Sequence, residues 1–328
     1  MIGSYKNHVI TIAGGGIQRC TRLKSTHSLR GAVQNVKPPI VTIGNFDGVH
    51  KGHQKVLKAV KDRAEKLRLP SVVYTFEPHP LKIVAPHKSP FLLTTLKEKI
   101  ELIKASGVDY LILARFTKAF ASMHPWEFVE DTLVKQLKAK EVWVGHDYAF
   151  GKGRTGTIEY LKELGKKFGF KVSVIPARKK RRLIISSSKI REYIRYGKVR
   201  DAAGFLGRPY AVSGKVVKGR NIGRHLGFPT ANIEIHNELI PKDGIYAVKV
   251  ILGNKIYKGA VNVGFAPTFH TNKRAVEAHI INFKQNIYGK KLKIGFIQRL
   301  RGEKTFKSTE GLAIQIKRDV EKVKKILK

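Results

Sequence analysis

The sequence predicts two domains of different class: an α/β domain with a doubly wound parallel sheet, then an antiparallel β-barrel with a closing helix. At 328 residues the chain is longer than a single hydrophobic core usually organises. From residue 40 to about residue 175, short apolar runs alternate with amphipathic helical stretches, which is typical of a parallel sheet with helices on both faces. From Tyr210 onward, β-branched and aromatic runs are separated by Gly, Pro, Asn and Asp turns, which indicates antiparallel strands.

The first half contains five expected strands with helices between them. A capping box, Thr95 to Glu98, starts the second helix, and Pro125 fits the first turn of the third. In a sheet of this kind, ligands bind at the carboxyl ends of the strands. The expected strands are Ile40–Ile43, Ser71–Phe76, Val108–Leu113, Glu141–Val144 and Lys171–Ile175, and the expected helices are Gly52–Lys66, Thr95–Ser106, Pro125–Leu137 and Thr157–Phe168.

The second half begins with a helical pair and ends with a helix at Ser308–Leu327, where a period of 3.6 returns. We expect a basic N-terminal extension at 1–39, a first domain at 40–186, a helical connector at 187–207 and a second domain at 208–328. The paired helices are expected at Ser188–Tyr196 and Lys198–Leu206, and the strands at Tyr210–Val217, Tyr246–Ile251, Ile256–Val263, Val276–Phe283 and Leu292–Arg299.

Composition points to a globular protein of a reducing compartment. Apolar residues make up 42% of the chain, and no stretch approaches the roughly 20 apolar residues of a membrane helix. Cys20 is the only cysteine, which excludes an intramolecular disulfide and a cysteine-based metal cage. We therefore expect a cytoplasmic protein without a transmembrane segment. The sequence leaves its oligomeric state open.

The charge balance is extreme, with 64 Lys and Arg against 24 Asp and Glu and a net charge of +40. Such a field attracts ATP, RNA and acidic membrane surfaces without identifying one of them. The basic run Arg178–Arg182 is similar to a nuclear-localisation signal or an RNA-binding patch, but no nucleic-acid module or aromatic platform accompanies it. We interpret the run as a solvated loop, and we expect non-specific polyanion binding and no specific nucleic-acid partner.

The first 40 residues hold six Lys or Arg and no Asp or Glu, a composition that organellar transit peptides share. An irregular extension of a basic chain has the same composition, and residues Val9–Ile12 also fit an edge strand. Of these alternatives we favour the irregular extension.

The most informative segment is Val41–His53, where a β-branched run ends in a Gly-rich turn and two histidines stand where a helix should begin. Glycines let backbone N–H groups approach an anion, and a helix N-terminus supplies a positive dipole end. The imidazoles of His50 and His53 can meet the charge of a phosphoryl transition state. The alternative is a strand–turn–helix with two surface histidines, but the spacing Gly-x-Phe-Asp-Gly-x-His-x-Gly-His favours a nucleotide phosphate site.

Three later segments add groups to the ends of expected elements. Phe76 ends the second strand and Asp147 follows the fourth. The run Ile-Ser-Ser-Ser-Lys-Ile-Arg opens a helix, and its hydroxyls and N–H groups, with Arg191 one turn on, suit ATP phosphates. Taken alone, Ser187 is an ordinary helix cap and Arg191 a solvated base, whereas the order and spacing of all four segments favour a site. His79 is expected to be structural, because the adjacent prolines fix its strand end.

A second Gly-rich segment, Gly219–Asn232, places three glycines four residues apart, which favours a mobile flap near phosphates over a helix. It lacks the Gly-Lys-Ser/Thr ending of a P-loop, and it ends instead in Pro-Thr-Ala-Asn. Alone, Thr230 and Asn232 would be turn residues after a proline. Glu277 stands in an otherwise apolar strand, where alternation by itself favours an outward-facing residue. The three glycines are Gly219, Gly223 and Gly227.

From about residue 40 to its end, the chain resembles the bifunctional riboflavin kinase/FAD synthetases of bacteria. The segment Gly44–His53 resembles their nucleotidyltransferase signature, and Gly219–Asn232 resembles their riboflavin kinase signature. Supporting segments follow in family order in both halves. Tyr148 stands where the family has Phe, and Asn282 where it often has Asp.

The resemblance implies that riboflavin is phosphorylated to FMN in the barrel and that FMN is adenylylated to FAD in the α/β domain, with ATP and Mg²⁺ serving both steps. In the α/β domain it implies transition-state stabilisation by His50 and His53. The nucleotide would be bound by Gly44, Asn45, Phe46 and Gly52, the triphosphate by Ser187 and Arg191, and the flavin side by Phe76 and Asp147.

In the barrel, the resemblance implies that Glu277 takes the proton from the riboflavin 5′-hydroxyl as it attacks the γ-phosphate. Thr230 and Asn232 would hold Mg²⁺ and the nucleotide. The flap that binds ATP and flavin would contain Gly219, Gly223, Gly227 and Pro229.

Two alternatives remain. The first is a chain in which only the kinase is active, against which the intact His50, His53, Ser187 and Arg191 argue. The second is a basic RNA-binding or regulatory protein on the same fold, which rests on the charge alone.

Overall fold

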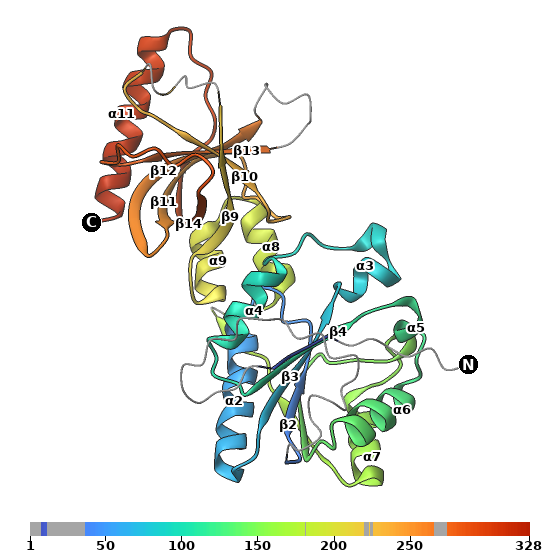
Figure 1. Cartoon of the computed structure of the whole chain (residues 1–328). Helices are drawn as coiled ribbons and strands as arrows, with labels where there is room; N and C mark the ends of the chain where they lie inside the picture. The colour runs from blue at the N-terminus through green and yellow to red at the C-terminus, as the bar shows by residue number, and fades with distance from the viewer. Residues whose placement is uncertain (1–7, 12–36, 181, 220–222, 224–225, 266–273) are drawn as a thin grey trace. The chain divides into compact units, whose positions relative to one another are not determined.

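The computed structural model describes residues 8–11, 37–180, 182–219, 223, 226–265 and 274–328. The chain divides into two compact units. The first comprises the residues up to Pro90 together with Leu96–Ile185, and the second comprises Phe91–Thr95 together with Ser186–Lys328 (Figure 1). Each unit has its own sheet and its own core.

The first unit is built on a six-stranded sheet with the order β1-β4-β3-β2-β5-β6. Five strands are parallel, and β1 adds to β4 in the antiparallel direction. The central strand β2 has β3 on one side and β5 on the other, so the strand order reverses there, and ligands bind at such a switch point. The strands are β1 (His8–Thr11), β2 (Ile40–Ile43), β3 (Ser71–Glu77), β4 (Tyr110–Arg115), β5 (Glu141–Gly145) and β6 (Lys171–Ile175).

Helices cover both faces of this sheet, as Figure 1 shows for α2 and α4 on one side and α6 and α7 on the other. Side chains of β3 alternate between the two cores: Val73 packs with α2 and α4, while Tyr74 packs with the π-helix and α7. The elements are α2 (Lys51–Leu67), α3 (Pro80–Val84), the 3₁₀-helix Pro86–Lys88, α4 (Leu96–Lys104), α5 (Lys118–Ala121), α6 (Pro125–Glu127), the π-helix Phe128–Gln136, the 3₁₀-helix Lys152–Arg154 and α7 (Ile158–Phe168).

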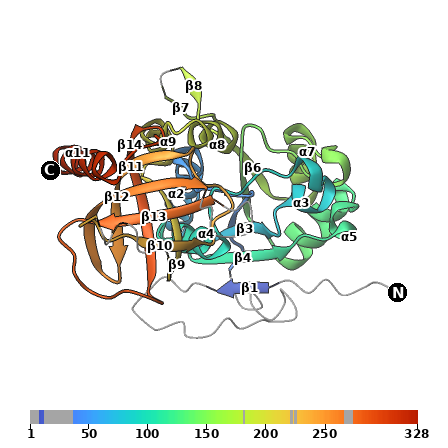
Figure 2. The ribbon, with the colours of Figure 1, turned by 90° about the horizontal axis from the view of Figure 1, so that it is seen from above.

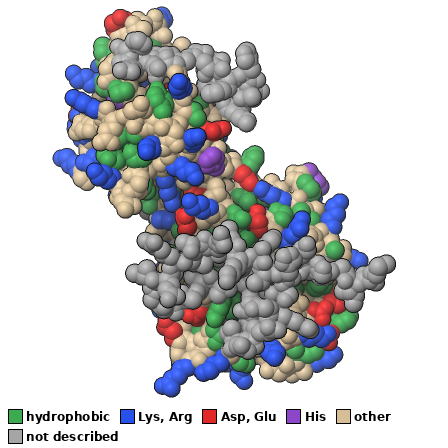
Figure 3. All heavy atoms as spheres, in the orientation of Figure 1, with side chains coloured by type: hydrophobic (Ala, Val, Ile, Leu, Met, Phe, Trp, Pro, Cys, Tyr) green, Lys and Arg blue, Asp and Glu red, His purple; other side chains and the backbone are tan. Residues whose placement is uncertain are grey.

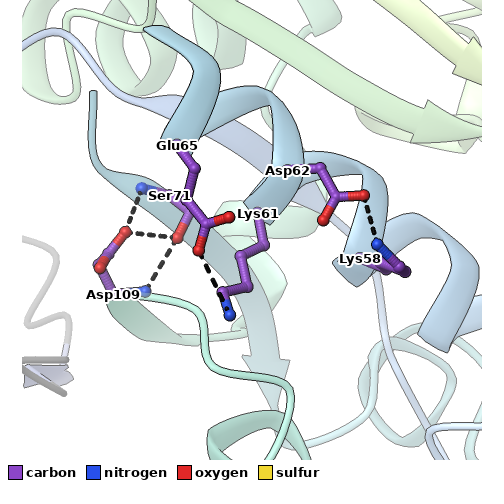
Figure 4. Close-up of polar contacts among 6 residues, drawn as sticks. All are labelled: Lys58, Lys61, Asp62, Glu65, Ser71 and Asp109. Atoms are coloured by element: carbon purple, nitrogen blue, oxygen red, sulfur yellow. Dashed lines mark hydrogen bonds and ion pairs between the residues drawn. The ribbon is translucent and has the colours of Figure 1, made fainter. Parts of the chain in front are cut away.

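Polar contacts fix the amino ends of the strands, opposite the edge where a ligand is expected. Ser71, at the start of β3, donates from its backbone N–H and its hydroxyl to the Asp109 carboxylate, and Asp109 donates its N–H to the Ser71 hydroxyl (Figure 4). Figure 4 also shows the ion pair of Lys58 with Asp62 on the surface of α2. The contacts between Ser71 and Asp109 help to set the register of β3 against β4.

The second unit is a closed six-stranded antiparallel barrel with the order β10-β13-β12-β11-β14-β9. Two short helices precede it, and α11 lies along its outer surface (Figures 1 and 2). The elements are α8 (Ser187–Arg195), α9 (Val199–Leu206), β9 (Tyr210–Val217), β10 (Ala231–Ile235), β11 (Gly244–Leu252), β12 (Lys255–Phe265), β13 (Arg274–Ile280), β14 (Lys291–Arg301) and α11 (Thr309–Ile326).

The structure confirms the predicted fold class and corrects several details. The irregular extension is wrong for His8–Thr11, which form the edge strand β1. The predicted loop at the basic run is also wrong, because β7 (Lys179–Lys180) and β8 (Leu183–Ile184) pair as a short hairpin. Strand β10 was not predicted. Lys and Arg side chains are scattered over the visible surface rather than gathered in one patch (Figure 3).

Candidate active sites

The Gly-rich turn of the first unit leaves the carboxyl end of β2 in a constrained backbone conformation. The Gly44 N–H donates to the carbonyl of Tyr74, which keeps the chain on the sheet for one residue more. Phe46 and Val49 then adopt positive φ angles of 49° and 38°. Their side chains are buried in the core beside α2, so packing holds a conformation that L-residues rarely adopt. Asn45 accepts at its carbonyl from the Thr75 hydroxyl.

The two histidines of the motif form one compact pair at the start of α2. His50 is the N-cap, and its Nδ1 accepts the backbone N–H of His53 at 3.2 Å. The two rings stack with centroids 3.6 Å apart and an interplanar angle of 16°. Phe46 lies edge-on to His53 with ring centroids 5.2 Å apart. Gly52 lies against the His50 ring, and a β-carbon there would come within 3.0 Å of it.

The electrostatic surroundings of this pair favour the binding of an anion. Burial lowers the pKa of His53 well below 6.5, and the neighbouring His50 lowers it further. His53 is therefore neutral at pH 7, and its buried Nδ1 has no hydrogen-bond partner among the described residues. The first turn of α2 carries no acidic side chain that would oppose the positive end of its dipole. A bound triphosphate would favour the protonated imidazole, because an adjacent negative charge raises a histidine pKa.

Lys99 belongs to this edge of the sheet and was not recognised from the sequence. It lies on α4 with 8% exposure, and its Nζ donates to the carbonyl of Phe76 at 2.9 Å. The same ammonium lies 3.6 Å from the Glu77 carboxylate. Burial lowers the pKa of Lys99, while Glu77 and the buried Asp47 of the Gly-rich turn raise it. A single buried cation thus connects the end of β3 with the turn.

Of the two flavin-side candidates, Phe76 is part of an aromatic cluster and Asp147 is on the surface. The Phe76 ring contacts those of Tyr74, Phe116 and Phe120, with centroids 5.5 to 5.8 Å apart. The Asp147 side chain is 82% exposed and lies 3.8 Å from His146. Phe76 lies on β3 and Asp147 follows β5, and β2 separates these two strands in the sheet.

The segment with Ser187 and Arg191 lies in the second unit. Ser186, rather than Ser187, is the N-cap of α8, since its hydroxyl accepts the N–H of Lys189. Arg191 is buried, and its Nε donates to the carbonyl of Phe91 at 2.9 Å, which excludes the solvated-base alternative. His79 caps α3 through its Nδ1, as expected of a structural residue, and its Nε2 lies 3.4 Å from Asn45 Nδ2.

In the barrel, the described glycines Gly219 and Gly223 lie close to the residues that end the Gly-rich segment. Residues 220–222 and 224–225 lie outside the described part. A β-carbon on Gly219 would overlap the Asn232 amide, so the segment begins directly on that side chain. The Phe228 N–H donates to the Gly223 carbonyl at 2.7 Å, and a β-carbon on Gly223 would lie 3.3 Å from Thr230 Oγ1. Gly227 has a φ of 80°.

Glu277 lies between two amide side chains on neighbouring strands. In the register of the barrel it is opposite Asn232 of β10 and opposite Asn262 of β12. Its neighbours Val276 and Ala278 are buried in the barrel, so Glu277 projects outward, as alternation predicts. Because opposite residues of paired strands share one face, these three side chains form a row. We call Asn232, Glu277 and Asn262 the cross-strand row.

His279 was also missed from the sequence, although it shares the outward face of β13 with Glu277. Its Nδ1 lies 2.9 Å from the Pro229 carbonyl, and its ring is edge-on to Phe228 with centroids 5.5 Å apart. This contact fixes the residues that directly precede Thr230. The spacing of two residues from Glu277 is the signal that could have identified it.

The donor set near the cross-strand row suits a hard cation. The Thr230 hydroxyl and the Asn232 amide offer oxygen ligands of the kind that Mg²⁺ takes while keeping several waters. In the described part of the chain, no three His, Cys, Asp or Glu side chains group as a metal site. None of the helices in that part is long and apolar enough to cross a membrane.

Comparisons with known proteins agree for both units. The FAD synthetase family profile matches residues 33–189, and the riboflavin kinase family profile matches residues 206–327. The bifunctional riboflavin kinase/FMN adenylyltransferase of Escherichia coli (strain K12) is 37% identical over 298 residues, covering 90% of this chain and 95% of the relative. The protein of the same name from Haemophilus influenzae is 39% identical, covering 87% of this chain and 92% of that relative. A solved structure described as a macrolide-efflux protein from Streptococcus pneumoniae is 32% identical with a TM-score of 0.80, covering 89% of this chain and 96% of that one.

Proposed function

Because the chain belongs to the family of bifunctional riboflavin kinase/FMN adenylyltransferases, we propose which of its residues carry each step. The protein phosphorylates riboflavin to FMN with one ATP and adenylylates FMN to FAD with a second. The observation that carries this assignment is that each family profile matches a separate, successive part of the chain.

In the adenylylation step, an FMN phosphate oxygen attacks the α-phosphorus of ATP, a new P–O bond forms, and pyrophosphate leaves with the electrons of the broken bond. No covalent enzyme intermediate is needed, so positioning and charge stabilisation carry the rate. The backbone of Gly44, Asn45 and Phe46, with Gly52 at the start of α2, receives the nucleotide. His50 and His53 donate to the charge that builds on the phosphates, which the empty hydrogen-bonding position of His53 Nδ1 supports.

The remaining adenylyltransferase roles follow from the resemblance and from local structure. Ser187 and Arg191 bind the triphosphate from the first turns of α8, at the positive end of the helix dipole. Phe76 offers an aromatic surface to the flavin, which its partly buried aromatic cluster supports. Asp147 is accessible for a flavin contact because its side chain is exposed.

In the kinase step, the riboflavin 5′-hydroxyl attacks the γ-phosphorus of ATP, ADP leaves, and Glu277 takes the hydroxyl proton. Thr230 and Asn232 hold Mg²⁺, which supplies neutralising charge to the phosphates when bound. Gly219, Gly223, Gly227 and Pro229 shape the flap over ATP and flavin. The direct approach of Gly219 to Asn232 supports a flap that ends at the metal-binding side chains.

The decisive experiment incubates the protein with riboflavin, ATP and Mg²⁺ and separates the flavins by chromatography. FMN should appear first and FAD later, with pyrophosphate released in step with FAD. Accumulation of FMN without FAD would leave a kinase alone, and no conversion would overturn the assignment of both sites.

The net charge of +40 supports a further, non-specific interaction with polyanions, and the single cysteine fits a reducing, cytoplasmic compartment. The affinity for an unrelated RNA should fall steeply as salt rises, because the attraction comes from counterion release. An affinity that depends on RNA sequence at physiological salt would show a specific nucleic-acid partner instead.

A further inference from the structure

One polar atom of the barrel has no assigned task and no partner. The side-chain Oδ1 of Asn262 is buried, and no hydrogen bond reaches it from the residues that the structure describes. A buried amide oxygen without a donor destabilises the folded protein, because it has given up its hydrogen bond to water. Such an atom is explained when a donor arrives with a ligand.

The position of Asn262 shows which ligand can supply that donor. Asn262 is directly opposite Glu277 in the pairing of β12 with β13. The β-carbons of opposite residues are about 4.5–5.5 Å apart, so the two side chains can contact the same substrate group. On the other side of Glu277 lies Asn232, the residue assigned to Mg²⁺ and nucleotide.

Two candidate ligands differ in the chemistry they would offer. The phosphates of ATP carry only acceptor oxygens and cannot donate to an amide oxygen. The ribityl chain of riboflavin carries hydroxyl groups, each of which can donate one hydrogen bond. In the proposed reaction the part of ATP beside Glu277 is the phosphate chain, and the adenosine hydroxyl and amino donors are not at the reacting end. An unpaired acceptor opposite Glu277 therefore selects the flavin substrate over the ATP phosphates.

We propose that Asn262 is a riboflavin-binding residue of the kinase site, whose Oδ1 accepts a hydrogen bond from a ribityl hydroxyl beside the one that faces Glu277. This rests on the proposed role of Glu277. The contact aligns the reacting hydroxyl by holding its neighbour. Each residue of the cross-strand row then has a separate role. Asn232 binds Mg²⁺ and the nucleotide, Glu277 takes the hydroxyl proton, and Asn262 binds the flavin.

The test replaces Asn262 with Leu in the full chain and measures kinase kinetics and melting temperature. Leucine has a similar volume but offers no acceptor. The riboflavin KM should rise about tenfold, the cost of losing one buried hydrogen bond. The KM for ATP and the adenylylation of added FMN should not change. The melting temperature of the ligand-free protein should stay the same or rise, because an unpaired buried oxygen is removed.

The melting temperature distinguishes a binding role of Asn262 from a structural role, because replacing a structurally important asparagine would lower it. Lys258→Met is the matched control, because Lys258 is on the same strand and face but is exposed. Asn262→Ala gives a second variant with the same expected kinetics if the leucine packs poorly. An unchanged riboflavin KM, a raised ATP KM or a lowered melting temperature in both variants would overturn the proposal.

Glu277→Gln, measured in parallel, distinguishes the two levels of inference. If it leaves riboflavin phosphorylation intact, the row is not the kinase site and the proposed roles fail together. If it abolishes phosphorylation while Asn262→Leu behaves as the parent protein, only the role of Asn262 is wrong.

Discussion

His50 and His53 stack ring on ring, 3.6 Å between centroids, while the Nδ1 of His50 caps the helix by accepting the His53 N–H. The cap fixes the His50 ring, and the stack then fixes the His53 ring against it. This explains why the motif needs two histidines three residues apart: one orients the other at the positive end of a helix dipole.

His53→Ala should therefore impair FAD formation from FMN by about 10²–10³-fold, the usual effect of losing one donor to a developing phosphate charge. Riboflavin phosphorylation should continue at its normal rate, because His53 lies in the first unit. Chromatographic assay of both products checks this. Near-normal FAD production by a folded variant would mean that His53 does not stabilise the transition state.

The lowered pKa of His53 makes a separate prediction about stability. In the unfolded chain His53 titrates near 6.5, whereas in the folded protein its pKa lies well below that value. As pH falls below 6.5, the unfolded state binds the proton first, so the free energy of unfolding decreases. His53→Gln should remove this term and lose less stability between pH 7 and pH 5. Denaturant unfolding at several pH values measures the difference, and parallel curves for the two proteins would contradict it.

The sequence predicted regular elements well where local pattern decides them. The bounds of β2 and β6 agree with the prediction, because each is a short apolar run with a turn after it. Strand β10 was missed because its residues Ala231–Ile235 directly follow the Pro-Thr motif and were read as its continuation. The pairing of β1 with β4 joins two segments that are far apart in the sequence, and no local pattern predicts such a pairing.

Candidate site residues could be proposed from the sequence where a motif marks them, and they were missed where only tertiary packing brings them to the site. His50 could be proposed from the spacing of its motif, whereas Glu277 could be proposed only from the resemblance to the riboflavin kinases, because alternation by itself favoured an ordinary outward-facing residue. The importance of Asn262 and His279 follows from the strand pairing, which places Asn262 opposite Glu277 and His279 beside the Pro229 carbonyl. This pairing could not be predicted from the sequence. Lys99 looks like any of the many surface lysines, and only its burial against the end of β3 distinguishes it.

Lys99→Met should reduce adenylylation of FMN at least tenfold and leave the kinase unchanged. The methionine keeps the apolar stem but leaves the Phe76 carbonyl and the Glu77 carboxylate without their cation. Displacing a positioning element by about 1 Å costs up to about 100-fold in rate. Lys97→Met on the same helix is the control, since Lys97 is exposed. Equal adenylylation activities of the two variants would show that Lys99 has no role in this step.

Glu277→Gln should give the opposite pattern to the His53 variant. Glutamine keeps the size and most hydrogen bonding of the side chain but cannot take the hydroxyl proton, and loss of a general base costs about 10²–10⁴-fold. Riboflavin phosphorylation should be lost while FAD synthesis from added FMN is preserved. Intact kinase activity with impaired adenylylation would mean that the two sites have been assigned to the wrong halves of the chain.

A fragment that begins at Ser186 should still phosphorylate riboflavin, because the barrel closes on itself and α11 covers its outer core. The structure adds one qualification to this separability. The segment Phe91–Thr95 belongs to the second unit: Arg191 donates to the Phe91 carbonyl, and the Leu92 N–H donates to Glu238. The fragment lacks these contacts, so it should melt at a lower temperature than the barrel of the full chain.

Thermal melts followed by far-UV circular dichroism, with kinase assays below the transition, measure both effects. Glu238→Ala in the full chain removes the side-chain acceptor of the Leu92 N–H and should lower the barrel transition by part of the same amount. A folded fragment without kinase activity would show that the first unit supplies a group essential to phosphorylation. If the fragment is as stable as the barrel of the full chain, the segment Phe91–Thr95 contributes nothing to the stability of the barrel. The burial of Leu93 would then have no effect on that stability.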